Sequence, residues 1–577
     1  MGISSSKSVH RQDNGEEEEE EDDDFENILS KAALARRTER IRLDFPIEFP
    51  VLDATHCEYT PFISPDHPSL LTTLPPELIT NLVSHLDNRS IKNLRLTCRL
   101  FRVVKLRISR VFLSANPLNI HVLRSIADHD VYRQGIIELI YDDARLCHSS
   151  TDHSDNALPE EVSRLYFDRS ITGMEWFQTR RDMNLNDLRQ RRRGEDPGRP
   201  EHLAISRQVN AELSLEESWT YYQDLVRQQD DVVAHGADIE AFQYALQRFP
   251  ALRRVSVTPA AHGWLFTPLY ETPMIRAFPS GFNYPIPRGW PTKLPGYPGE
   301  EPAPWEDSKA RWRGYCLVTK ILAQQQQHHR VSEFLIDSHY LHTGLNCRIF
   351  EEPSQEYSDL LSCLQLPGLK RLHLSLMVEY SWTDFRQSLM RNALAKASQL
   401  EHFSLETSMN HFSYSPNRYP HHERPPALQT FLPIDCWTWL QHFRLWNFPV
   451  DSADLISTLS QLPALQSLEL GFLCMGSNTQ RQLLEDMRDT LCWHERLTKP
   501  KVTFAVSDLS PSRQMPGRAI WFDEEVENFL YHGGENPFEN KAYDNIRYDM
   551  GVVRDAYDPL YERLHVDPLK YHKLYMA

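Results

Sequence analysis

The sequence predicts an α/β protein in which a short three-helix segment precedes an irregular solenoid of strand–helix units with long insertions. Apolar residues recur at helical spacing between residues 74 and 113, and three later segments repeat a helix–proline–strand unit. Proline-rich or strongly charged stretches interrupt these units. With 577 residues, of which 41% are hydrophobic, the chain is long enough for several structural units and a sizeable core.

Residues 1–69 are expected to form a disordered acidic tail and linker. Nine contiguous carboxylates, Glu16 to Asp24, hold half of the formal net charge of −18, and adjacent like charges repel and bury nothing. Prolines then recur through residues 44–68 and indicate an extended linker. The acidic balance disfavours nucleic-acid binding, which requires a cationic face.

Gly2, followed by Ser6, fits the N-myristoylation pattern, and the alternative is an ordinary unstructured start. One myristoyl chain binds membranes only marginally, so we expect at most weak membrane tethering. The sequence has no apolar run long enough to span a bilayer and no secretory signal. Nine scattered cysteines without a Cys-x-x-Cys pair fit a reducing compartment, so we expect a cytoplasmic or nuclear protein.

Residues 70–115 read as three short amphipathic helices. Leu74 to Leu78 opens the first helix with proline and glutamate in its first turn. A polar break at 87–90 precedes the second helix, and a third helix is predicted through Val104, Ile108 and Val111. A segment this small buries too little surface alone, so it should need a partner or a neighbouring domain.

This stretch resembles the F-box. The opening Leu-Pro-x-Glu-Leu and the run from Leu94 to Phe101 carry the resemblance, with mild departures at Thr97 and at Ser90-Ile91. The resemblance implies docking onto the Skp-family adaptor of a cullin–RING ubiquitin ligase. The residues that match the family's adaptor-binding or supporting face are Leu74, Pro75, Leu78, Leu82, Ile91, Leu94 and Cys98.

Behind the F-box-like segment, residues 249–257, 366–374 and 462–470 share one pattern, and each follows a helical stretch. Weaker copies begin at Ile136, Val331, Leu400 and Leu440. The unit resembles an irregular leucine-rich repeat without an asparagine ladder, and the order of parts looks like F-box proteins of filamentous fungi. We therefore expect a repeat domain over 116–510, with insertions at 142–235 and 259–330, and a C-terminal cap at 511–577.

The outward positions of the predicted strands would line a concave sheet face. We expect a protein target to bind near Arg371, His402, His442, Arg444 and Trp446, because arginine and tryptophan dominate binding hot spots. The alternative is an ordinary polar sheet face.

The insertions leave two further alternatives. The first insertion, 142–235, is predicted to hold helices at 158–188 and 212–234. Its basic cluster from Arg189 to Arg193 is either a solvated linker or a nuclear-localisation patch. Residues 259–304 are rich in proline and aromatic residues, which either pack on the repeats or face a substrate.

No phosphate loop, nucleophile elbow or metal-ligand spacing occurs in the sequence, so we expect no enzyme activity, no cofactor and no metal. The leading hypothesis is a substrate receptor of a cullin–RING ligase that holds an unknown protein target. The alternatives are an adaptor-bound scaffold, tethered to membrane through Gly2 or not, and an unrecognised enzyme in the aromatic insertion.

Overall fold

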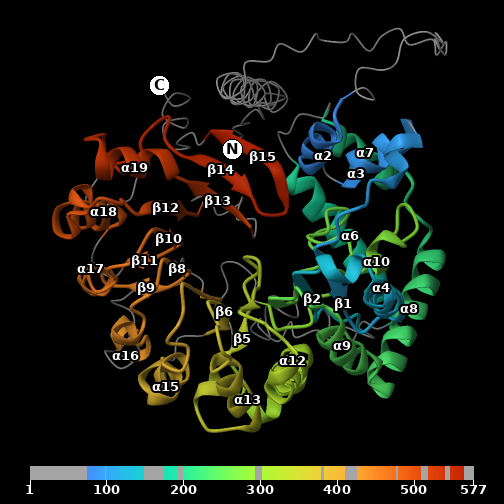
Figure 1. Cartoon of the computed structure of the whole chain (residues 1–577), viewed down its shortest axis with the longest axis horizontal. Coiled ribbons are helices and arrows are strands. Elements are labelled where there is room, and N and C mark those ends of the chain that lie inside the picture. Colours follow the sequence, from blue (N-terminus) through green and yellow to red (C-terminus); the bar gives the residue numbers. More distant parts are fainter. Residues whose placement is uncertain are drawn as a thin grey trace, which may run out of the picture.

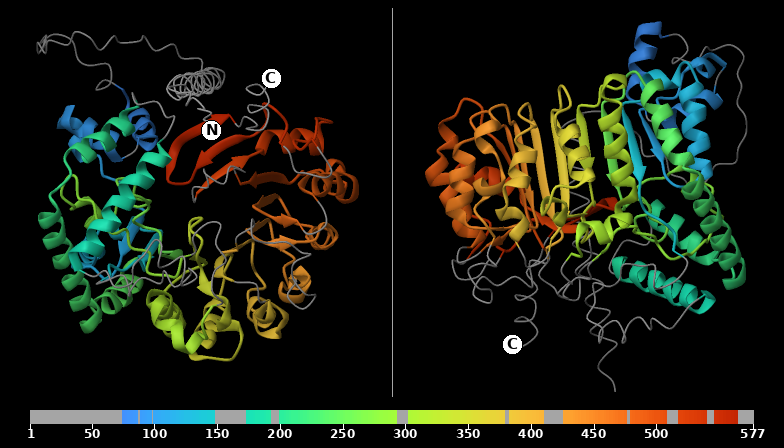
Figure 2. Two further views of the ribbon diagram at one scale, coloured as in Figure 1. Left: turned by 180° about the vertical axis from the view of Figure 1, so that it is seen from behind. Right: turned by 90° about the horizontal axis from the view of Figure 1, so that it is seen from below.

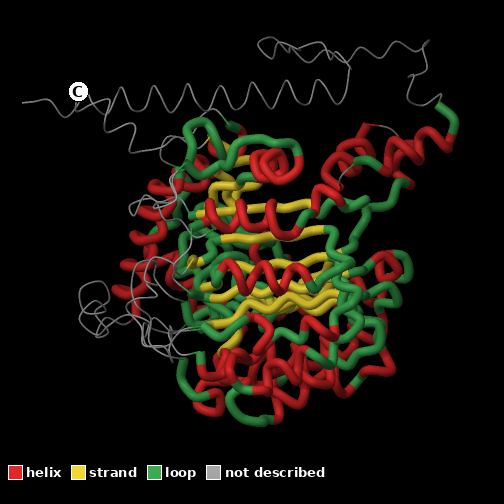
Figure 3. The backbone as a smooth tube through the Cα atoms, turned by 90° about the vertical axis from the view of Figure 1, so that its left-hand side faces the viewer, coloured by secondary structure: helices red, strands yellow, loops and turns green. Residues whose placement is uncertain are grey.

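One large sheet runs through the described part of the molecule. The computed structural model describes residues 74–86, 88–97, 99–147, 173–192, 199–292, 302–378, 382–409, 425–475, 479–507, 517–539 and 546–564. Within these ranges the strands of a 13-stranded sheet follow one another in the order of the chain, and Figure 3 shows them lying side by side.

The first nine strands along the sheet are parallel to their neighbours. They are β1 (Arg110–Leu113), β2 (Glu138–Asp142), β3 (Arg254–Thr258), β4 (Glu333–Ile336), β6 (Arg371–Met377), β7 (His402–Thr407), β8 (His442–Trp446), β10 (Ser467–Gly471) and β12 (Lys501–Val506). The short β5 (Leu345–Asn346) also pairs with β6, and β9 (Pro449–Val450) pairs with β11 (Cys474–Met475). Each of the seven predicted repeat segments contains one of these strands.

Helices cover the outer face of the parallel strands, and Figure 1 shows them at the periphery of a curved molecule with the strands inside. These helices are α4 (Pro117–Asp128), α9 (Ala237–Arg248), α12 (Arg313–Gln324), α13 (Gln355–Leu364), α15 (Ser388–Leu394), α16 (Leu428–Phe431), α17 (Ser452–Ser460), α18 (Gln480–Leu491) and α19 (Asp523–Tyr531). Leucines at the strand positions that face these helices, such as Leu372, Leu405 and Leu445, are fully buried against them.

The C-terminal part, predicted as a cap, continues the sheet. Strands β13 (Arg518–Trp521), β14 (Val552–Asp555) and β15 (Asp558–Leu564) extend it in antiparallel fashion beyond β12. The period-2 pattern of these strands is too short to predict from sequence, because only four residues of β13 and four of β14 are paired.

The first insertion forms helices α6 (Gly173–Arg191), α7 (Pro200–Asn210) and α8 (Leu215–His235). Ser214 and Glu217 form a capping box that begins α8. Arg191, at the end of α6, is only 5% exposed, so this part of the basic cluster is not a solvated linker.

Arg191 joins the insertion to the C-terminal strands. Its guanidinium lies 2.9 Å from the Asp555 carboxylate, which also contacts Arg518 at 2.8 Å. The Arg191 guanidinium also stacks 3.8 Å from the centre of the Trp264 ring, whose edge meets Tyr557. The two ends of the curved sheet region are therefore bridged, as the approach of β14 and β15 to α6 shows in Figure 1.

The aromatic insertion packs on the protein in its described part. Phe282 and Tyr284 are buried in a cluster with Trp176 and Tyr222, and Trp290 is fully buried with its indole donating to Asp143. The short helices α10 (Pro273–Arg276) and α11 (Trp305–Ser308) lie in the same stretch, and α14 (Thr383–Arg386) lies further along the chain. In the described residues the packing alternative therefore accounts for these rings.

The N-terminal helices are α2 (Pro76–Ser84) and α3 (Asn88–Thr97), followed by the 3-10 turn η2 (Arg99–Val103). The third helix predicted through Val104, Ile108 and Val111 is wrong, because β1 begins at Arg110 and Val111 is buried in the sheet. The spacing of these apolar residues, four and three apart, fits a helix. Pairing with the parallel strand β2 nevertheless makes residues from Arg110 onward a strand, because tertiary contacts outweigh the local spacing. Figure 2 shows α2 and α3 projecting beyond the edge of the sheet at which β1 begins.

Among the described residues, none of the helices combines the length and the apolar character that crossing a membrane requires.

Candidate functional site

Helix α2 presents an apolar stripe to the surface. Pro75 precedes the helix, Pro76 occupies its first position, and Glu77 lies in its positively polarised first turn. Leu78 and Leu82, one turn apart, are 51% and 48% exposed, and no residue of the helix is buried. Two neighbouring leucines left half in water are typical of a surface that a partner covers.

The other residues predicted for the adaptor face have different environments. Ile91 on α3 is fully buried, and Leu94 and Leu74 are half-buried, so Ile91 supports the segment from inside. Pro75 is exposed, while Cys98 lies outside the described residues. The sequence reasoning did not single out Leu96 and Val103, which are the most exposed apolar side chains here, at 86% and 78%.

Arg107 holds the end of α2. Its guanidinium donates to the carbonyl oxygens of Ser84 at 2.5 Å, Val83 at 2.7 Å, and Leu86. Its backbone is tied to Asn88, which donates to the Arg107 carbonyl at 2.6 Å and accepts from its N–H at 2.8 Å. These bonds satisfy carbonyls at the end of the helix that have no partner within the helix. No sequence motif predicts them.

The five residues predicted to bind a target fall into two groups on the inner face of the sheet. Arg371, His402 and His442, each the first residue of its strand, are partly exposed. Arg444 is 6% exposed and Trp446 is fully buried, so the expectation that these two lie on an open surface is wrong.

Aromatic side chains from distant parts of the chain cover Trp446. Its ring centre lies 5.1 Å from those of Tyr340 and Phe472 and 5.4 Å from that of Trp521. A Cβ added to Gly471, its register partner on β10, would lie 2.1 Å from the indole. The indole therefore packs flat on the neighbouring strand, and only glycine at position 471 leaves it the space.

Arg444 lies between two carboxylates. It donates to Glu469 at 2.7 Å and to Glu406 at 3.2 Å, and its guanidinium also lies 5.4 Å from the centre of the Tyr340 ring. Burial raises the pKa of the Glu406 carboxyl to about 7, although Arg444 opposes this shift. A buried cation whose donors are taken up by two carboxylates in this way is not free to bind a target.

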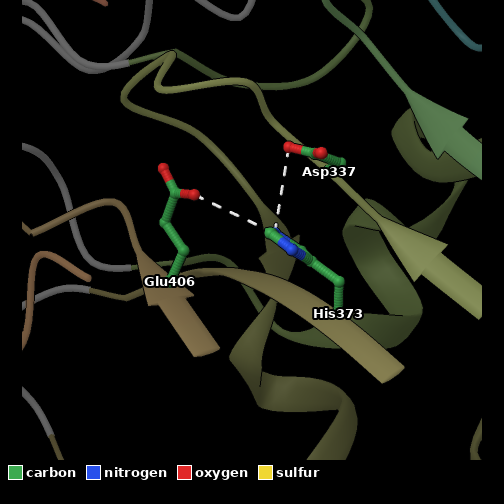
Figure 4. A group of neighbouring side chains, drawn as sticks. All are labelled: Asp337, His373 and Glu406. Atoms are coloured by element: carbon green, nitrogen blue, oxygen red, sulfur yellow. Dashed lines mark ion pairs between the residues drawn. The ribbon is translucent and has the colours of Figure 1, made fainter. Parts of the chain in front are cut away.

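Asp337, His373 and Glu406 form the group in the described residues that most resembles a metal site (Figure 4). The His373 Nε2 atom lies 3.8 Å from Asp337 Oδ1 and 3.9 Å from Glu406 Oε2. Burial lowers the pKa of His373 to about 3, so its ring is neutral near pH 7. However, Arg444 already donates to the same Glu406 oxygen.

A divalent ion between these three ligands would lie beside the Arg444 guanidinium, and the two cations would repel each other. The hydroxyl of Ser375, 3.3 Å from His373 Nε2, adds a further internal partner. The geometry therefore favours a polar cluster that neutralises itself, and the expectation of no bound metal stays a prediction. Sequence reasoning missed this cluster because its three members come from three different chain segments.

Gly2 and the acidic run lie outside the described residues, so N-myristoylation and weak membrane tethering stay predictions.

Comparison with protein families matches the F-box domain to residues 71–105. No curated protein sequence matches the chain. The matched residues include α2, α3 and η2, which present the exposed stripe of Leu78 and Leu82. The chain therefore carries an F-box domain directly before the first strand of its sheet.

Proposed function

We propose that this chain is the substrate-receptor subunit of a cullin–RING ubiquitin ligase. The F-box domain would dock onto a Skp-family adaptor, and the sheet domain would hold a protein target. The exposure of Leu78 and Leu82 on α2, within the matched F-box, carries this proposal. Covering the exposed half of one such leucine would contribute about 0.7–1.5 kcal/mol to adaptor binding.

The sheet domain would act as an irregular leucine-rich-repeat-like solenoid. Support comes from the order of the nine parallel strands, which follows the chain, and from helices joining most of them on the outer face. Such stacked units offer extended surfaces to partners. The chain itself would perform no chemistry, because bringing target lysines near the charged ubiquitin carrier raises their effective concentration.

Adaptor binding tests the first part of the proposal. The full chain should co-purify with a Skp-family adaptor, and Leu78→Asp/Leu82→Asp should abolish this because two charges would enter an apolar interface. Leu497→Asp is the matched control, since Leu497 is fully exposed and lies outside the F-box match. Adaptor binding that survives the double substitution would contradict the proposal.

A second measurement separates a receptor from the alternative of an adaptor-bound scaffold. Cells that express Leu78→Asp/Leu82→Asp in place of the original chain should accumulate at least one protein and lose its ubiquitin conjugates. Quantitative proteomics of total and ubiquitin-enriched extracts would measure both changes. If the adaptor binds and no protein accumulates, the scaffold explains the F-box and the receptor role is wrong.

A further inference from the structure

Arg371, His402 and His442 form a row across three adjacent parallel strands. They are direct register partners on β6, β7 and β8, so their side chains leave the same face of the sheet at the edge where these strands begin. Neighbouring strands lie about 4.8 Å apart, which places the three side chains along a line of roughly 10 Å. All three are partly exposed, unlike Arg444 two residues further along β8.

Arg371 differs from the arginines that begin β1 and β3, which are aligned with it through the register of the sheet. Arg110 pairs with Glu138 at 2.6 Å, and Arg254 pairs with Glu333 at 2.5 Å. Between the described residues the Arg371 side chain makes no ion pair or hydrogen bond, and its buried Nε has no partner. Burial and the nearby Arg254 lower the pKa of Arg371, and the charges of Glu333, Asp337 and Glu138 only partly offset this shift.

The two histidines extend the donor row beside Arg371. Their ring centres lie 5.6 Å apart. Burial and the neighbouring Arg371 lower the pKa of His402, and burial lowers the pKa of His442 to about 4. Near pH 7 each ring is therefore neutral and has one N–H to donate, and each would gain a proton more readily beside an anion.

We propose that Arg371, His402 and His442 form a subsite for an oxyanion, the carboxylate or phosphoryl group of an acidic segment in the protein target. A guanidinium presents parallel N–H donors that match the oxygens of such groups, and two imidazoles extend the donor row. The ligand then supplies the direct hydrogen-bond partner that Arg371 lacks, because the oxygens of the neighbouring Glu333 are paired with Arg253 and Arg254. This inference rests on the proposed receptor function and names the chemistry of its target.

The position of the row suits a receptor. The F-box match ends at residue 105, and β1 begins at Arg110 in the same row as Arg371. The F-box helices and the donor row therefore lie at the same edge of the sheet, as the right-hand view of Figure 2 shows for α2 and α3. A target bound to this row would lie at the same edge of the sheet as the F-box helices, and therefore near the proposed adaptor.

Fluorescence anisotropy with three labelled peptides of equal length tests the subsite on the full chain. One peptide carries glutamates, one carries phosphoserines at the same positions, and one carries glutamines. The glutamate or the phosphoserine peptide should bind and the glutamine peptide should not, with affinity that falls as salt rises. Tighter binding of one anionic peptide identifies which oxyanion the row prefers.

Arg371→Gln should weaken binding of the anionic peptide at least about tenfold, which corresponds to one charge-assisted hydrogen bond. His402→Asn/His442→Gln should weaken it less at pH 7, and should remove a gain in affinity between pH 7 and 5. That gain reflects proton uptake by these rings, against the influence of Arg371, Arg254 and Arg444 and with that of Glu333, Glu401 and Glu469. Arg227→Gln is the charge-matched control, since this side chain is 73% exposed on α8.

Three outcomes would overturn the subsite: no anionic peptide binds, Arg371→Gln binds as well as the original chain, or Arg227→Gln loses as much affinity. Vesicles containing phosphatidylserine that bind in an Arg371-dependent way, while the peptides do not, would assign the row to a membrane and also overturn it. Adaptor co-purification of Arg371→Gln should be unchanged. A failed peptide assay with intact adaptor binding therefore counts against the subsite alone.

Discussion

Two leucine stripes in this chain have opposite environments. On α2, Leu78 and Leu82 are about half exposed, whereas Leu372, Leu405 and Leu445 in the sheet are fully buried under the outer helices. Both stripes follow simple sequence periodicity, with every fourth residue in the helix and alternate residues in the strands. The difference shows that the sheet domain supplies its own cover, while the F-box leaves its leucines half exposed, as the proposed docking onto an adaptor requires.

The largest expected effect tests this contrast directly. Leu405→Asp should destabilise the chain by more than about 5 kcal/mol, because it removes a fully buried side chain and introduces a charge into the apolar core. Leu82→Asp should change the free energy of unfolding by less than about 0.5 kcal/mol while it abolishes adaptor binding. Denaturant unfolding and adaptor pull-down of both variants measure the two effects.

If Leu82→Asp unfolded the chain as Leu405→Asp does, the exposed stripe would be part of the core, and the contrast would be wrong. Leu497→Asp serves as the control for adding a carboxylate at an exposed leucine.

The next effect concerns the bridge between the first insertion and the C-terminal strands. Asp555→Ala should destabilise the folded chain by about 3–5 kcal/mol, since Arg191 would keep its burial and lose its carboxylate partner. Asp558→Ala, which removes a more exposed carboxylate from Arg199, should cost less than about 1 kcal/mol. Thermal unfolding compares the stability of the two variants. Equal losses of stability would show that the buried ion pair at Asp555 contributes no more than the more exposed one at Asp558.

Seven of the nine parallel strands could be predicted from sequence because each repeats the same alternation of apolar residues, which depends only on local spacing. The spacing around β1 predicts part of a helix instead, and β12 is not among the predicted repeat segments. The burial of Trp446 could not, because its cover comes from Tyr340 and Trp521, which lie far away in the chain. One local signal was present: Gly471, within a strand pattern, indicates close approach of another group. The partly exposed row at Arg371 could be predicted by residue type, but its lack of a partner required the structure.

The third effect concerns His262, a buried histidine of the aromatic insertion, and the dependence of stability on pH that its burial causes. His262 is 1% exposed, its Nδ1 lies 2.7 Å from the Tyr284 hydroxyl, and burial lowers its pKa to about 3. The unfolded chain binds a proton there below about pH 6.5, but the folded chain does not until near pH 3. Stability from this group is therefore complete above pH 6.5 and is lost as the pH falls towards 3.

His262→Gln should destabilise the chain at pH 7, and the difference should shrink by about 2 kcal/mol at pH 5. Asp142, whose Oδ2 lies 3.8 Å from His262 Nε2 and whose pKa burial raises to about 8, titrates in the opposite sense in both the original chain and the variant. Denaturant unfolding at the two pH values measures the change. A difference that is constant with pH would show that His262 is not held neutral by burial.

The smallest effect returns to the F-box, where hydrogen bonds from Arg107 hold the end of α2. Arg107→Met removes the donors to the Ser84 and Val83 carbonyls and should lower the local stability of α2 by about 1–1.5 kcal/mol. Hydrogen exchange in α2 should quicken roughly tenfold while exchange in β6 and β7 stays unchanged. Arg102→Met is the matched control, as Arg102 is exposed in the same segment. If Arg107→Met left exchange in α2 unchanged but weakened adaptor binding, Arg107 would contact the adaptor instead of positioning the helix.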